Sequence, residues 1–131
     1  MSDVIHHAFI VTGVDLPGLP YLDQAHAFAV GLGLPVTELT PPVVNCYRSF
    51  MVAPTGSKSG WDDDIQPAKA RDQLQAYLWA QKEAGIPLDW VRVEYGNPQG
   101  EAQLLAASDD ITPHAFKRQR NKRSEDHEPT K

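Results

Sequence analysis

CYRSFMVAPTGSKSGWDDDIQPAKARDQLQAYLWAQKEAGIPLDWVRVEY, residues 46–95, contains the patterns of a strand, a loop, a helix and a second strand in one continuous run. Residues 54–60 form the loop, because two glycines, a proline and two serines favour turns. The three aspartates at 62–64 suit the positive end of the helix that follows, and one of them is expected to cap it. Gly85 and Pro87 then end this helix.

Side chains in this run are assigned to faces by their periodicity. The helix at 65–84 is expected to place one stripe on the sheet: Ala70, Leu74, Tyr77, Leu78 and Gln81. The strand at 43–53 is expected to face the core with Val44, Cys46, Phe50 and Val52, with Arg48 near a rim. The strand at 88–95 is divided into a core face with Val91, Val93 and Tyr95 and an opposite face with Trp90, Arg92 and Glu94.

The rest of the chain adds further elements. Residues 5–12 are apolar on both faces, which is typical of a central strand. Helical spacing predicts a helix at 21–32, and residues 36–40 are compatible with a short edge strand before two prolines. For residues 101–107, periodicity leaves open both a last strand and a helical turn.

The order β-α-β-β-α-β predicts an α+β fold, a ferredoxin-like sandwich with an antiparallel sheet and both helices on one face. Residues 1–107 are predicted to form this single domain, with an extra C-terminal strand left open. Residues 108–131 are predicted to be a mostly disordered polar and basic tail. The face of the sheet without helices would then be open, and Trp90, Arg92 and Glu94 would stand on it. Some of Tyr47, Ser49 and Met51 are expected on the same face.

Composition narrows the class of protein. A chain of 131 residues with 41% hydrophobic residues suits one domain with one core. No apolar run reaches the ~18 residues of a membrane span, and no secretory signal is recognised. Because the single Cys46 cannot form an internal disulfide, a cytoplasmic location is expected.

Charge is divided between an acidic body and a basic tail. Residues 117–131 carry six basic and three acidic residues, which leaves 6 basic against 14 acidic residues in the remainder. An acidic body is poorly suited to a phosphate backbone. The basic residues of the tail keep open a role as a nucleic-acid accessory protein: Lys117, Arg118, Arg120, Lys122 and Arg123.

Three motifs could indicate chemistry, and each also has a structural interpretation. Lys58 lies in a loop that lacks the glycines of a phosphate loop, and three carboxylates follow it. His6 and His7 point to opposite faces of a strand, so they are poorly placed to share a metal ion with residues 62–64. Cys46 is expected to be a core residue. No catalytic residue, metal or cofactor is therefore assigned, and a small metal- or phosphate-handling enzyme stays an alternative.

SFMVAPTGSKSGW at 49–61 and LDWVRVEYG at 88–96 resemble a group of small uncharacterised proteins of bacteria and of their phages or mobile elements. The resemblance covers roughly the middle half of the chain. It implies a shared fold and a phage or mobile-element setting, with no catalytic residues to transfer.

These observations favour a small acidic, non-enzymatic interaction module that modulates a host factor. It would bind a protein partner, or a second copy of itself, through the open sheet face and the acidic loop. The residues expected to contact this partner are Trp90, Arg92, Glu94, Trp61, Asp62, Asp63 and Asp64.

Overall fold

The computed structural model describes residues 4–58, 60–96 and 100–109. It contains strand β1 (His6–Val14), helix α1 (Tyr21–Gly31), strand β2 (Tyr47–Val52), a short 3₁₀ helix (Asp62–Asp64), helix α2 (Ile65–Glu83), strand β3 (Leu88–Tyr95) and strand β4 (Gln103–Ala107). The open question about residues 101–107 is thus answered by a strand. Neither described helix is long and apolar enough to cross a bilayer.

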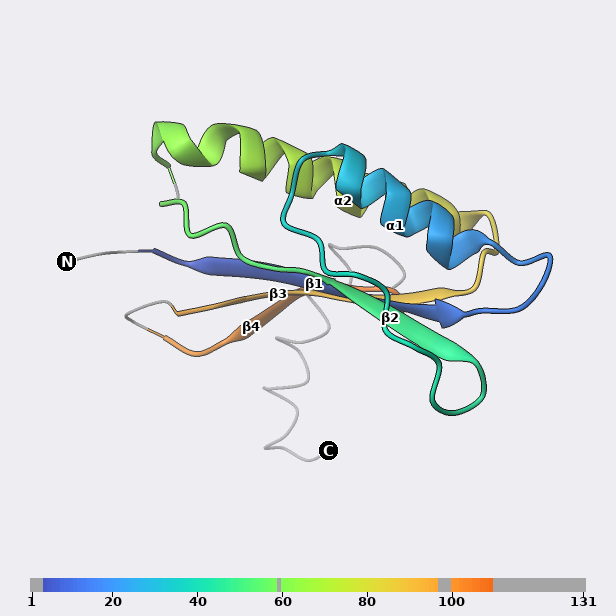
Figure 1. Cartoon of the computed structure of the whole chain (residues 1–131). Coiled ribbons are helices and arrows are strands. Elements are labelled where there is room, and N and C mark those ends of the chain that lie inside the picture. Colours follow the sequence, from blue (N-terminus) through green and yellow to red (C-terminus); the bar gives the residue numbers. More distant parts are fainter. Residues whose placement is uncertain (1–3, 59, 97–99, 110–131) are drawn as a thin grey trace, which may run out of the picture.

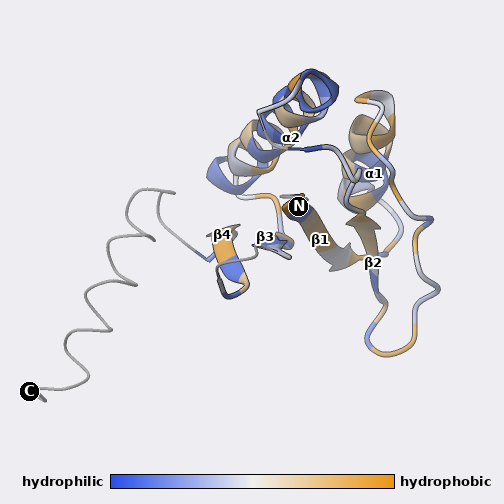
Figure 2. Cartoon of the chain, turned by 90° about the vertical axis from the view of Figure 1, so that its left-hand side faces the viewer, coloured by the Kyte–Doolittle hydropathy of each residue, from blue (hydrophilic) through white to orange (hydrophobic). Residues whose placement is uncertain are grey.

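The four strands form one antiparallel sheet in the order β2-β1-β3-β4. Both helices lie on the same face of this sheet (Figure 1). The view along the layers in Figure 2 shows the two helices side by side above the strands. The predicted α+β class, with an antiparallel sheet and helices on one face, is confirmed at this level.

The register of β1 decides which side chains meet the helices. Val11 lies opposite Phe50 on one side and Trp90 on the other. Because directly paired residues of an antiparallel sheet share a face, Trp90 belongs to the same face as these buried residues. It is only 2% exposed, and its ring packs edge-on against Trp79 of α2, with 5.4 Å between ring centroids.

The assignment of Trp90, Arg92 and Glu94 to the uncovered face is therefore wrong. Alternation groups these three side chains correctly, but both groups on β3 contain large apolar residues, so the pattern alone does not say which group is inside. The indole adds much buried area, and Arg92 finds polar partners on α2. Together these contacts place this group under the helices.

The strand predicted at 43–53 begins later than expected. Asn45 and Cys46 have φ angles of 56° and 62°, in the left-handed region that an extended strand excludes. They form a turn before Tyr47, whose N–H donates to the carbonyl of Val44. Cys46 and Val44 are exposed, so their assignment to the core is wrong, whereas Phe50 and Val52 are buried as predicted.

A segment beside the outer edge of β2 takes the place of the short strand predicted at 36–40. Val36 forms an isolated bridge with Val52. The N–H of Thr37 donates to Met51 O at 2.9 Å, and the N–H of Thr40 donates to Ser49 O at 2.9 Å. The hydroxyl oxygens of these two threonines accept the N–H groups of Met51 and Ser49. The outer backbone of β2 is thereby satisfied.

The sheet face opposite the helices, here called the open face, carries the alternate residues of the four strands. Its large exposed side chains are Ile10, Tyr47, Met51 and Tyr95. Pairing joins Ile10 to Met51 on one side and to Val91 on the other, and Val91 to Ala107. An apolar row thus crosses all four strands.

Candidate functional site

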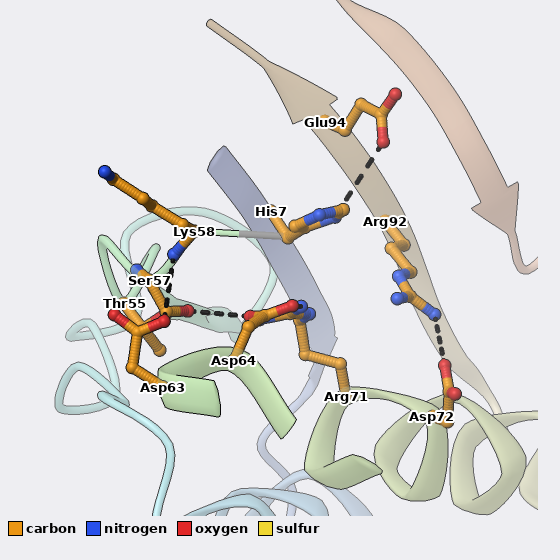
Figure 3. A network of polar contacts seen from close by, with 10 residues as sticks. All are labelled: His7, Thr55, Ser57, Lys58, Asp63, Asp64, Arg71, Asp72, Arg92 and Glu94. Atoms are coloured by element: carbon orange, nitrogen blue, oxygen red, sulfur yellow. Dashed lines mark hydrogen bonds and ion pairs between the residues drawn. The ribbon is translucent and has the colours of Figure 1, made fainter. Parts of the chain in front are cut away.

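A cluster of ionisable side chains lies where α2 begins above the sheet. It is called here the polar cluster, and Figure 3 shows its members with their neighbours. Strands β1 and β3 supply three of its side chains, and the 3₁₀ helix and α2 supply the other two: His7, Arg92, Glu94, Asp64 and Arg71.

The centre of the polar cluster is the ion pair between Asp64 and Arg71. Their side chains are 9% and 6% exposed, and Arg71 Nη2 donates to Asp64 Oδ1 at 3.1 Å and to Oδ2 at 3.3 Å. Asp64 directly precedes α2 and lies seven residues, about two helical turns, before Arg71, so the two side chains are on the same side of the helix. Ser57 Oγ donates to Asp64 Oδ1 at 2.7 Å, which ties the preceding loop to the pair.

These contacts change the expected role of Asp64. It directly precedes α2, but its carboxylate caps no N–H group of that helix. Its oxygens are occupied by Ser57 and Arg71 instead. The carboxylate therefore joins the loop to the helix, while its negative charge still lies at the positive end of the α2 dipole.

Strand β3 is joined to α2 by Arg92. Its Nη1 donates to Gln75 Oε1 at 2.6 Å and to Asp72 Oδ1 at 3.3 Å. Glu94, two residues along, places Oε1 4.0 Å from His7 Nδ1. Arg92, expected to meet a partner, is thus engaged within the chain, whereas Glu94 lies near His7 without a hydrogen bond to its Nδ1.

Burial and charge shift the protonation of the polar cluster. Burial, and then the positive charges of Arg71 and Arg92, lower the pKa of His7, against the opposing effect of Glu94. Burial alone would raise the pKa of Asp64, but hydrogen bonds from Ser57 and Arg71 outweigh it and lower that pKa. His7 is therefore held neutral and Asp64 ionised.

The neutral state of His7 predicts a pH-dependent stability. The pKa of His7 is lower in the fold than its ordinary value of 6.5, so below pH 6.5 the unfolded chain binds a proton that the folded chain resists. We expect the free energy of unfolding to fall as the pH decreases through this region, and the His7→Gln variant to lose part of that fall. Urea denaturation above and below pH 6.5 measures it. Equal pH dependence in both proteins would contradict a buried neutral His7.

The polar cluster is largely buried, which limits its chemistry. Three of its nitrogen atoms are buried and have no hydrogen-bond partner among the described residues: His7 Nδ1, Arg71 Nε and Arg92 Nε. Within the same part of the chain, no three His, Cys, Asp or Glu side chains are grouped to hold a metal ion. The arrangement joins a loop and a helix to the sheet.

A second feature is a shallow hollow on the surface, lined by Gly60, Trp61, Asp62 and Asp63. The indole of Trp61 is 61% exposed, and Lys58 Nζ lies 4.6 Å from its ring centroid. Asp63 Oδ1 accepts the N–H of Lys58 at 3.3 Å. Trp61, Asp62 and Asp63 are thus brought together as expected, but Trp90 is buried in the core and does not join them.

The open face itself was predicted, but the sequence assignment put Trp90 on it and did not include Ile10, which the structure places there. Ile10 and Met51 are 46% and 38% exposed on adjacent strands. The alternation in residues 5–12 already places Ile10 on the opposite face from Phe9 and Val11. The position of Ile10 could therefore be predicted from the sequence. The five basic residues proposed for nucleic acid, at 117–123, lie outside the described residues.

Comparisons with known proteins identify no relative. No family model matches the chain, and neither a curated protein nor a solved structure is similar to it. The sites above are therefore interpreted from their own geometry.

Proposed function

We propose that this chain is a small non-enzymatic protein-interaction module that binds its partner through the open face. The observation that carries this proposal is the apolar row of Met51, Ile10 and Val91 on three adjacent strands, on the face without a described helix. A contiguous exposed apolar patch on a small domain is typical of an interaction site. Exposed Tyr47 and Tyr95 add aromatic rings, which are enriched in protein interfaces.

The polar cluster supports docking over catalysis. Catalysis requires reactive groups around a space that a substrate can enter. Here Asp64 is occupied by Ser57 and Arg71, and both members of that ion pair are almost completely buried. The open face offers contact area instead of a reaction centre.

The proposal includes a ferredoxin-like topology. If residues 36–40 are counted as a strand, because they pair with β2, the order of elements becomes β-α-β-β-α-β. The two helices then cover one face, and β4 is an addition beside β3. In such a sandwich the second face of the sheet is free for a partner.

The setting is also a proposal. The resemblance of residues 49–61 and 88–96 to small proteins of bacteria, phages and mobile elements supports a role in modulating a host factor in the cytoplasm. The partner expected on the open face is a protein, because the face presents apolar and aromatic side chains rather than a basic surface for nucleic acid.

The test compares capture by two charged variants. Ile10→Glu places a carboxylate in the middle of the open face, whereas Ala76→Glu places one on the exposed side of α2. We expect Ile10→Glu to lose at least tenfold in the partner captured from a native-host extract, and Ala76→Glu to capture as the wild type does. Far-UV circular dichroism and thermal melting check that both variants fold. Equal capture by both would exclude the open face as the docking surface.

A further inference from the structure

We propose that the partner seated on the open face is a second copy of this chain, so that two sheets pack face to face in a two-fold dimer. This inference rests on the proposed function, since it requires the open face to be a docking surface. It specifies that the partner is an identical chain and that a two-fold axis relates the two chains. The support comes from the charge, the layout and the area of the face.

The charge of the open face favours an identical partner. The chain has 17 acidic and 12 basic residues, but among the paired positions of this face the only Asp, Glu, Lys or Arg is Asp89, near the start of β3. A basic partner would find a single carboxylate there. An uncharged apolar surface is complementary to another of the same kind, and a two-fold interface joins the same patch from both copies.

The layout of side chains suits a two-fold axis near Ile10. This residue lies on β1, between Met51 of β2 and Val91 of β3, so it is central in the apolar row. Tyr47 pairs with Val14 at one end of β1, and Tyr95 pairs with His6 at the other. A residue near the axis of an isologous interface meets its own copy. Ile10 would then contact the partner's Ile10 between sheets roughly 10 Å apart.

The area of the face suits a weak dimer. Four strands about 4.8 Å apart, with on average roughly seven residues at ~3.3 Å each, cover on the order of 440 Å². Two copies would then bury roughly 900 Å², which is in the range of weak, transient interfaces. The dimer is therefore expected to be reversible and dependent on concentration.

The chain's own C-terminal residues are less suited to cover the open face than a second copy of the chain is. Residues 110–131 contain few apolar side chains suited to an apolar face, chiefly Ile111, Ala115 and Phe116. From residue 117 onward the segment has a net charge of +3, for which the open face offers only Asp89. Burying unpaired cations on an apolar surface is unfavourable. The second copy needs no such pairing.

The first experiment measures the mass of the full chain in solution across a concentration series, by sedimentation or light scattering. We expect the wild type to approach twice the chain mass, and Ile10→Glu to remain monomeric with a dissociation constant raised at least tenfold. Ala76→Glu, on the exposed side of α2, is the matched control and should dimerise as the wild type does. Unchanged dimerisation of Ile10→Glu would overturn the assignment of this face.

The second experiment tests proximity at the axis. In a Cys46→Ser background, which removes the only native thiol, Ile10→Cys should form a disulfide-linked dimer on mild oxidation. Ala76→Cys in the same background should remain uncrosslinked. Absence of the Ile10→Cys crosslink in a protein that does dimerise would place the dimer contact elsewhere.

The remaining outcomes separate this inference from the proposed function. A monomeric wild type overturns the dimer, and the capture experiment then decides independently whether the open face binds another protein. If the Ile10→Cys thiol of that monomer is protected from a maleimide until Ile111→Ser and Phe116→Ser are introduced, the occupant is the chain's own tail. That result also overturns the dimer.

Discussion

Trp90→Ala is expected to lower the free energy of unfolding by about 3–5 kcal/mol, the usual cost of truncating a large buried aromatic residue. Trp90 is 2% exposed, lies opposite Val11 in the sheet and packs edge-on against Trp79 of α2. Its removal would leave a cavity between the sheet and the helix that the close packing of the core cannot fill without strain. Denaturant unfolding followed by far-UV circular dichroism measures the loss.

Trp61→Ala is the matched control for this prediction. Its indole is 61% exposed beside the surface hollow, so the same truncation should change the free energy of unfolding by no more than ~0.5 kcal/mol. Similar losses for the two variants would contradict the placement of Trp90 beneath α2. The pair thus distinguishes a core indole from a surface indole in one protein.

Arg71→Ala is expected to cost about 3–5 kcal/mol, because it leaves the carboxylate of Asp64 buried without its charge partner. Ser57 would still donate one hydrogen bond to Asp64, which compensates only part of the lost interaction. Replacing both members, with Arg71→Ala and Asp64→Ala, should cost less than the sum of the two single changes. Denaturant unfolding of the four proteins provides this double-mutant cycle.

Asp72→Ala is the control for the buried pair. Asp72 also forms an ion pair, with Arg92 Nη1 at 3.3 Å, but its side chain is 76% exposed. Solvent screens such a pair, and Gln75 still accepts a hydrogen bond from Arg92, so we expect a loss below ~1 kcal/mol. A loss as large as that of Arg71→Ala would mean that burial does not govern the energetics of this region.

Local signals predicted most element boundaries. The strand at Leu88–Tyr95 and the start of α2 at Ile65 are where turn residues and periodicity placed them. Gly85 has a φ of 82°, which glycine adopts without strain, so it ends the helix as expected. These features depend on residues close together in the chain and are therefore accessible from the sequence.

Features that depend on residues far apart in the chain could not be predicted from local sequence patterns. Which group of β3 side chains is buried is decided by Val11 and by α2, more than ten residues away.

The aspartates at 62–64 are identical in the sequence but differ in the fold. Asp62 and Asp63 line the hollow, whereas Asp64 is buried with Arg71. Arg71 lies three residues before Leu74 and seven before Leu78, so helical spacing places it on the buried side of α2, but only the fold shows that Asp64 is its partner.

The two threonines beside β2 also limit how the protein can aggregate. Thr37 and Thr40 each donate a backbone N–H to β2 and accept a β2 N–H on the hydroxyl, and the next two residues are prolines. A sheet margin without free donors cannot recruit an extended peptide, and proline further blocks strand addition. Addition of an extended peptide directly to the outer edge of β2 is therefore disfavoured, even though a neighbouring surface is apolar.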